Sequence, residues 1–175
     1  MRYIALLRGI NVGGNTMIKM DELRKAFEAL GFERVVSYIN SGNLAFDARK
    51  TSEANLVKKI ENLVEEMIGK RVQVMVREQQ DIEQVVANNP FDGKYQSHKE
   101  MHVLFLKSEL SDEQIAWLTE ATPSGEFFQV NGREIYSHLP MGVADSFLGR
   151  GLFEKKLKAA VTARNWRTVE KLAEL

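Results

Sequence analysis

Three short segments combine glycines, arginines and small polar residues in a way that suits the binding of an anion. They are a glycine-rich loop at residues 9–15 with Arg8 and Lys19 on either side of it, a turn at residues 40–43 and a polar stretch at residues 162–168. Glycines allow backbone amides to approach an anion closely, and guanidinium groups bind phosphate or carboxylate through two parallel hydrogen bonds. The predicted ligand-binding residues are Arg8, Gly9, Asn11, Gly13, Gly14, Asn15, Lys19, Ser41, Asn43, Arg164, Asn165 and Arg167.

The glycine-rich loop follows an apolar run and precedes an expected helix, an arrangement that can bind phosphate. Its spacing matches neither the GxGxxG pattern nor GxxxxGK followed by Ser or Thr. Asp21 and Glu22 occupy the first turn of the expected helix, where their carboxylates would repel a phosphate. We therefore expect an anion to bind the loop amides together with Arg8 or Lys19. The alternative is a structural loop whose glycines adopt positive φ angles.

The other two segments allow a ligand-binding and a structural interpretation alike. Ser41 and Asn43 can close a turn through their side chains, and the sequence leaves open whether this turn lies beside the loop. Arg164 and Arg167 are three residues apart, so they share a face if the last helix begins early, with Thr162 as its cap. The alternative is a helix anchored in the core by its tryptophan, with both arginines paired to acidic side chains.

Basic and acidic side chains are equal in number over the whole chain but are unevenly distributed along the sequence. The 175 residues contain 24 Lys and Arg and 24 Asp and Glu, so the formal net charge is zero. The net charge is +3 over residues 1–50, −2 over 51–100, −4 over 101–150 and +3 over 151–175. A neutral chain makes nucleic acid the weaker prediction for a partner. If the two basic ends meet, the three segments form one anion site; the alternative is charge scattered over a solvated surface.

The sequence excludes several classes of site. With no cysteine, the chain has no disulfide, thiol nucleophile or zinc–thiolate centre. His98, His102 and His138 have no metal-ligand spacing, so we predict no metal and no cofactor and can name no catalytic residue. No apolar run reaches the length of a membrane span, and the first residues lack the features of a signal peptide. We expect a cytoplasmic protein with no membrane partner and leave its oligomeric state open.

The elements that would position these segments form two similar halves. Apolar patterns predict a βαββαβ order in the first half, with strands at 3–7, 35–39, 44–46 and 72–76 and helices at 21–30, 52–68 and 81–87. The second half has a strand at 101–106 and a helix that begins with a capping box at 111–114. A hairpin centred on Asn131-Gly132 follows, with positive φ expected at both residues, and then come helices at 152–161 and from Trp166.

This order of elements is typical of the ferredoxin-like fold. The sequence therefore predicts an α+β fold of two ferredoxin-like βαββα-type halves that share one core, followed by a C-terminal helix. The halves are placed at residues 1–90 and 91–175, with a boundary near Pro90 to Gly93. The strands at 3–7 and 101–106 are apolar on both faces, which is typical of strands buried on both sides.

Four motifs together resemble a bacterial family. They are LRGINVGGN at Leu7–Asn15, KMDELR at Lys19–Arg24, YINSGN at Tyr38–Asn43 and ARNWRTV at Ala163–Val169. They span the chain and are similar to motifs of the domain-of-unknown-function 1697 family. The resemblance implies a duplicated α+β protein of the bacterial cytosol with no established activity, and it supplies no catalytic residue.

Three functions follow from these observations, in decreasing order of preference. The first is a binding module for a phosphorylated small molecule or nucleotide, because the loop amides and the cations Arg8, Lys19, Arg164 and Arg167 suit an anion. The second is a protein-interaction or structural module without a small ligand. The third is an enzyme that acts on a phosphorylated substrate.

Overall fold

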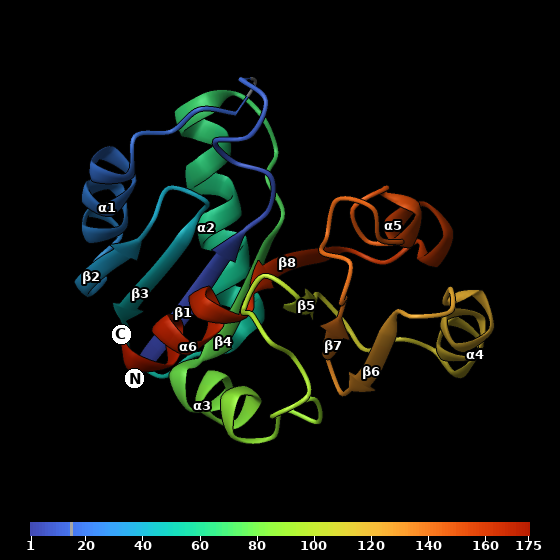
Figure 1. Cartoon of the computed structure of the whole chain (residues 1–175). Coiled ribbons are helices and arrows are strands. Elements are labelled where there is room, and N and C mark those ends of the chain that lie inside the picture. Colours follow the sequence, from blue (N-terminus) through green and yellow to red (C-terminus); the bar gives the residue numbers. More distant parts are fainter. Residues whose placement is uncertain (15) are drawn as a thin grey trace. The chain divides into compact units, whose positions relative to one another are not determined.

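Each half of the chain folds into the same order of elements. A computed structural model describes residues 1–14 and 16–175, apart from the side chains of residues 152 and 153. The first half contains β1 (Arg2–Leu7), α1 (Met20–Ala29), β2 (Glu33–Tyr38), β3 (Asn43–Asp47), α2 (Glu53–Ile68), β4 (Val74–Glu78) and α3 (Gln79–Ala87). The second half contains β5 (Met101–Leu106), α4 (Asp112–Ala121), β6 (Phe127–Asn131), β7 (Glu134–His138), α5 (Leu152–Leu157), β8 (Val161–Asn165) and α6 (Trp166–Glu174). Both follow the order βαββαβα, which confirms the predicted α+β fold with two ferredoxin-like halves (Figure 1).

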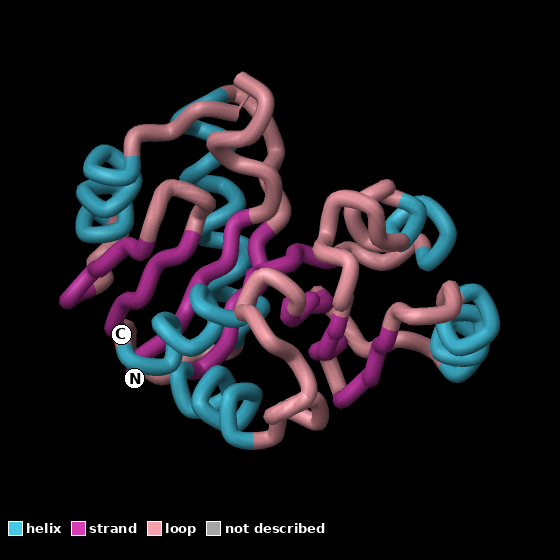
Figure 2. The backbone as a smooth tube through the Cα atoms, viewed as in Figure 1, coloured by secondary structure: helices cyan, strands magenta, loops and turns pink. Residues whose placement is uncertain are grey.

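Each half forms a four-stranded antiparallel sheet in which its first strand lies inside. The strand orders are β2-β3-β1-β4 and β6-β7-β5-β8 (Figure 2). The chain divides into two compact units, one of residues 1–84 with 170–175 and one of residues 85–169, so the divisions fall within α3 and α6. The expected halves at 1–90 and 91–175, and the core that they were expected to share, stay predictions.

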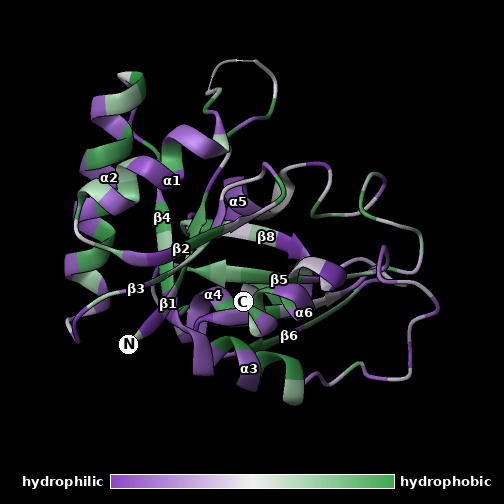
Figure 3. Cartoon of the chain, turned by 90° about the vertical axis from the view of Figure 1, so that its left-hand side faces the viewer, coloured by the Kyte–Doolittle hydropathy of each residue, from purple (hydrophilic) through white to green (hydrophobic). Residues whose placement is uncertain are grey.

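In the first unit, α1 and α2 pack apolar side chains onto the sheet. Leu23 and Phe27 of α1 and Ile60 of α2 are fully buried in a cluster with side chains of β1 and β3. Phe27 meets Phe46 of β3 edge-to-face, with ring centroids 5.5 Å apart, a geometry that aromatic pairs prefer. Ser52 caps α2 by accepting a hydrogen bond from a backbone amide of its first turn. Figure 3 shows hydrophobic and hydrophilic residues alternating along α2, as expected of an amphipathic helix.

In the second unit, β5 is buried on both faces, as predicted. Each of its residues is at most 9% exposed. Leu118 of α4 and Leu157 of α5 belong to the same apolar cluster as the end of β5. The predicted capping box begins α4, because Ser111 Oγ accepts a hydrogen bond from the Gln114 amide while Gln114 Oε1 accepts one from the Ser111 amide. The cap thus satisfies backbone groups at the start of α4, and Gln114 Nε2 also donates to Leu157 O at 2.8 Å.

The prediction of a helix at residues 152–161 is wrong for residues 158–161. α5 ends at Leu157, where Lys158 adopts a φ of +54°. The chain then enters the sheet as β8, which pairs antiparallel with β5. Val161 and Thr162 are β-branched residues, whose stiff side chains suit a strand better than a helix. The second unit therefore contains the same fourth strand as the first.

The predicted hairpin is present, but its turn lies one residue later. Asn131 of β6 pairs with Glu134 of β7, so the two-residue turn consists of Gly132 and Arg133. Gly132 has a φ of +58°, and it occupies the position at which a type II′ turn places glycine. The prediction of a positive φ at Asn131 is wrong, because this residue continues the strand.

The turn between β2 and β3 fits closely against the end of β1. The Leu7 amide donates a hydrogen bond to the Gly42 carbonyl oxygen at 2.8 Å. A Cβ atom at position 42 would lie 2.8 Å from Leu7 Cβ and 3.0 Å from Ile10 Cδ1, and Gly42 has a φ of +88°. Both the backbone conformation and the lack of space therefore require glycine at this position.

A histidine and a serine are buried side by side in the sheet of the second unit. His102 of β5 pairs in register with Ser137 of β7. Within the described part of the chain, neither His102 Nδ1 nor Ser137 Oγ has a hydrogen-bond partner. Burial lowers the pKa of His102 below its ordinary value, because a buried imidazolium loses its hydration. His102 is therefore neutral in the folded protein at neutral pH.

Replacing Gly42 with alanine should destabilise the protein more than the same change at Gly13. A Cβ atom at position 13 meets nothing within 4 Å, although φ is +69°, so Gly13→Ala should cost only about 1 kcal/mol. Gly42→Ala adds steric overlap with β1, and we expect a total loss of about 3 kcal/mol. Urea unfolding of the two variants measures this difference, and equal losses would contradict the close approach of the turn.

Gly132→Val should lower the free energy of unfolding by about 1–2 kcal/mol, because a valine at positive φ is strained. Gly132→Asn should lower the free energy of unfolding by less, since asparagine tolerates the left-handed conformation. Thermal unfolding of both variants checks the prediction. A valine variant as stable as the parent protein would mean that the turn has another conformation.

Acidification should destabilise the protein in a way that depends on His102. Since the pKa of this group is lower in the folded than in the unfolded chain, the unfolded chain binds more protons below the ordinary histidine pKa of about 6.5, and stability falls as the pH decreases. His102→Gln removes the titrating group, so its urea midpoint should decrease less than that of the parent between about pH 7.5 and pH 5.5. Identical pH profiles would show that His102 makes no such contribution.

Candidate ligand-binding loop

The side chain of Asn11 holds the glycine-rich loop together. Its Nδ2 group donates hydrogen bonds to Ile18 O at 3.0 Å and to Asn40 O at 2.6 Å, and its Oδ1 accepts one from the Ile18 amide at 2.8 Å. The Asn11 amide itself donates to Thr16 O at 2.9 Å. One side chain therefore joins both ends of the loop to the turn at residues 40–43. The sequence left this adjacency open, and the structure establishes it.

The backbone of the loop alternates between left-handed and ordinary conformations. Gly9, Asn11, Gly13 and Gly14 have φ angles of +66°, +56°, +69° and +81°. The sign of φ alternates over residues 9–13, and backbones of this kind can turn successive N–H groups towards one side and bind anions. Gly13 and Gly14 are exposed and have nothing within 4 Å where a Cβ atom would stand. The predicted site residue Asn15 lies outside the described residues.

The two predicted cations of the loop lie at its beginning and its end. Arg8 is half-buried; its guanidinium donates to Gln73 Oε1 at 3.0 Å and its amide to Gln73 O at 2.9 Å. Lys19 is exposed, and its Nζ lies 4.0 Å from Glu22 Oε1 of α1. Asp21, in the same turn of α1, forms an ion pair with Arg24. The first turn of α1 is thus acidic, as predicted, and the positive charge lies on the loop side.

The two predicted side chains of the β2–β3 turn point into the turn itself. Asn43 is fully buried and donates hydrogen bonds to Tyr38 O at 3.1 Å and to Ser41 Oγ at 2.9 Å. These bonds close the turn against which the loop rests. They agree with the structural interpretation of Ser41 and Asn43, whose contact with a ligand stays a prediction.

Exposed apolar side chains surround the loop, and the sequence interpretation overlooked them. Val12, Met17 and Ile39 are 67%, 62% and 52% exposed. Ile39 also has a φ of +48°, which is unusual for a β-branched residue. The sequence alone did not distinguish them, because Ile10 and Ile18 are apolar residues of the same segment and are buried.

The third predicted segment is divided between a strand and a helix. Arg164 lies in β8, is 7% exposed, and donates to Thr162 Oγ1 at 2.7 Å and to Ala163 O at 2.9 Å. Burial lowers the pKa of its guanidinium to about 10, so the group stays charged at neutral pH. Arg167 is exposed in the first turn of α6. The prediction of both arginines on one helical face is therefore wrong.

The start of α6 corrects a second detail of that prediction. Asn165 Oδ1, rather than Thr162, caps the helix by accepting a hydrogen bond from the Thr168 amide at 2.9 Å. Trp166 is buried and packs edge-to-face on Tyr95, with ring centroids 6.4 Å apart, which agrees with its role as a core anchor. Asn165 and Trp166 thus fix the end of β8 and the beginning of α6.

The two units carry a buried arginine at the same place in the repeat. Arg77 is the fourth residue of β4 and Arg164 the fourth residue of β8. Each guanidinium donates at 2.9 Å to the carbonyl oxygen of the preceding residue. The sequences VMVR and VTAR, which share their first and last residues, end in these arginines.

The sequence placed all three segments in one site. The loop and the β2–β3 turn belong to the first unit, whereas Arg164, Asn165 and Arg167 belong to the second. The structure joins the first two segments directly through Asn11. The participation of the third segment stays a prediction.

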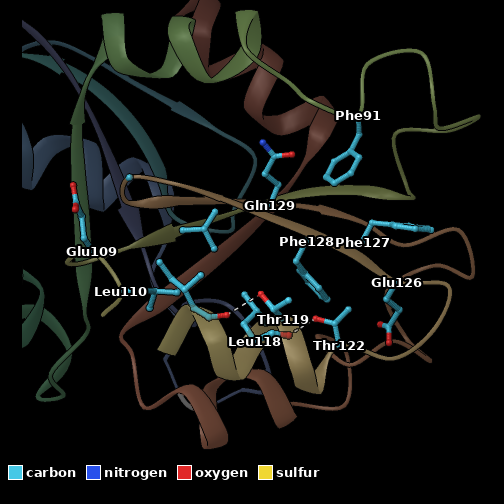
Figure 4. Close-up of a pocket in the computed structure, with 13 residues that line it drawn as sticks. Phe91, Glu109, Leu110, Leu118, Thr119, Thr122, Glu126, Phe127, Phe128 and Gln129 are labelled. Carbon is cyan, nitrogen blue, oxygen red and sulfur yellow. Dashed lines mark hydrogen bonds between the residues drawn. The ribbon is translucent and has the colours of Figure 1, made fainter. Parts of the chain in front are cut away.

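The second unit contains a pocket that sequence reasoning did not find. A cavity of about 560 Å³ lies between α4 and the outer strand β6. Figure 4 shows Phe128 of β6 extending towards Thr119 and Thr122 of α4. The charged side chains that line the pocket are Glu109 and Glu126. Its lining residues come from separate segments of the chain, so no local sequence motif predicts the pocket.

The described residues lack two other features. They contain no group of three or more His, Asp or Glu side chains arranged to hold a metal ion. No helix within this part of the chain is long and apolar enough to span a membrane.

Comparisons with known proteins extend the resemblance of the motifs. A solved structure, that of the conserved bacterial protein SP0830 from Streptococcus pneumoniae, is similar to the chain with a TM-score of 0.81 and 28% sequence identity, over 99% of this chain and 97% of that chain. No curated protein matches the chain. The family described as protein of unknown function, DUF1697, matches residues 1–136, which include the glycine-rich loop, the turn and the pocket and end before β8. The chain therefore belongs to the DUF1697 family.

Proposed function

We propose that the protein is a binding module for a phosphorylated small molecule or nucleotide, and that the loop between β1 and α1 binds the phosphate. The alternating signs of φ over residues 9–13 carry this proposal, because such a backbone can turn its amides towards a bound anion. Arg8 and Lys19 add positive charge at the two ends of the same loop. A cytoplasmic location, expected from the sequence, belongs to the same proposal.

The loop is held in shape by its own contacts. Asn11 joins it to Ile18 and Asn40, and Thr16 Oγ1 donates to Gly9 O at 2.5 Å. A loop held in its binding conformation loses little entropy when a ligand binds. These contacts therefore support binding as well as structure.

The apolar rim favours a nucleotide over a simple phosphate. Val12, Met17 and Ile39 expose apolar surface next to the loop backbone. A ligand with both a phosphate and a flat apolar group would use the amides and this rim together. The strained φ of Ile39 supports the same proposal, because strained conformations concentrate at binding sites.

An NMR titration of the ¹⁵N-labelled protein tests the proposal. We expect ADP to shift the amide resonances of Gly9, Gly13 and Gly14, pyrophosphate to shift them with lower affinity, and adenosine to leave them unchanged. The absence of any loop shift at about 10 mM ADP, a concentration that detects even a millimolar Kd, would overturn the proposal.

A pair of double variants separates specific contacts from net charge. Arg8→Ala/Lys19→Ala should weaken ADP binding about tenfold or more, because charge-assisted hydrogen bonds are lost. Arg49→Ala/Lys50→Ala removes the same charges from exposed positions after β3 and should leave the Kd nearly unchanged. Thermal unfolding confirms that both variants are folded. Equal losses in the two variants would show that only the overall charge matters.

A further inference from the structure

The outer strand β6 offers an edge at which the sheet of the second unit can be extended. β6 stands at the end of the order β6-β7-β5-β8, and in the described residues β7 is its single partner strand. Asn131 and Glu134 close the two-residue turn and form a hydrogen-bonded pair. Since such pairs alternate along an antiparallel ladder, the N–H and C=O groups of Val130 face away from β7.

A groove runs along this edge, between β6 and α4. Its floor consists of apolar side chains from the connection before α4, from α4 and from β6, namely Leu110, Ile115, Leu118, Phe128 and Val130. Thr119 and Thr122 of α4 line the opposite wall, and their hydroxyl groups donate to Ile115 O and Leu118 O. Phe91 and the exposed Phe127 stand at the rim (Figure 4). Strand edge and apolar pocket are thus parts of one surface.

We propose that this groove binds an extended polypeptide segment of a partner protein, which adds to β6 as a fifth strand. In this mode of recognition, backbone hydrogen bonds at the sheet edge hold the peptide and pockets accept alternate side chains. The five residues of β6 match a peptide strand of similar length, about 17 Å at about 3.4 Å per residue. The pocket of about 560 Å³ has room for the side chains that point towards α4.

The charged residues that line the groove are acidic, and they favour a basic partner. Glu109 is exposed, and its Oε1 lies 4.0 Å from where a Cβ atom of Gly132 would stand, just beyond the end of β6. Glu126 precedes β6 but is buried, and its Oε1 accepts a hydrogen bond from the Phe147 amide at 2.6 Å. Both glutamates line the pocket, whose lining includes no Lys or Arg. A segment with alternating apolar residues and with Lys or Arg at the end that lies beside Glu109 complements this pattern.

The same charges disfavour a second copy of this chain. Antiparallel pairing of two β6 strands would bring Glu126 of each copy towards Glu109 of the other. Like charges at such positions destabilise cross-strand pairs. This inference concerns a different unit from the nucleotide loop, so the two proposals succeed or fail separately.

Selection from a random library of displayed peptides of about ten residues tests the inference. We expect enriched peptides to alternate apolar residues and to carry Lys or Arg. N-methylation of every second amide should abolish binding of the best peptide in one of the two registers only, because one edge of a strand pairs with β6. Equal effects in both registers, or no enrichment at all, would overturn the proposal.

Matched variants locate the bound peptide by fluorescence anisotropy. Thr119→Trp fills the groove and should weaken binding at least about tenfold, whereas Ala116→Trp, on an exposed part of α4 that does not line the pocket, should not. Glu109→Lys should weaken binding of the basic peptide about tenfold, and Glu120→Lys should have little effect. A dimeric parent protein that Thr119→Trp converts to a monomer would show that a second copy covers the groove and would also overturn the proposal.

Discussion

The burial of β1 and β5 on both faces is the constraint on which each unit depends. All residues of β5, and residues 3–7 of β1, are at most 9% exposed. A central strand with two apolar faces must be flanked by strands and covered by other elements. This requirement determines which elements lie next to the strand, and polar segments lie beyond its ends. The continuous burial of β1 ends at Leu7, where the loop begins. Arg8, its first residue, is tied to Gln73 before β4.

The segment that follows the first strand differs between the two units. In the first unit, residues 8–19 form the glycine-rich loop before α1, held by Asn11. In the second, the shorter connection at residues 107–111 leads to α4 and contributes Glu109 and Leu110 to the pocket. The buried arginines Arg77 and Arg164 keep the same strand position in both. The two units thus share the order of their elements and this buried arginine, but they differ in the segment that follows the first strand.

Much of this fold is predictable because its signals are local. The continuous apolar runs of β1 and β5 and the capping box of Ser111 and Gln114 depend on neighbouring residues alone. The strand β8 was missed because Arg164 and Asn165 are polar, whereas the burial of Arg164 and the pairing of both residues depend on β5, about 60 residues away. For the same reason, the contact of Asn11 with Asn40 and the groove beside β6 could not be derived from spacing. They follow from strand order, which no single segment encodes.

The course of α6 has a consequence for the order in which the protein matures. Residues 170–175 belong to the first unit, where Arg2 Nε donates to Leu175 O at 2.8 Å and Gln79 Nε2 to Ala173 O at 3.2 Å. A ribosome makes these residues after the whole of the second unit, residues 85–169. The first unit, although it is synthesised first, therefore cannot complete its contacts until the second has emerged. Domains usually fold in the order of their synthesis, and here the order of completion is reversed.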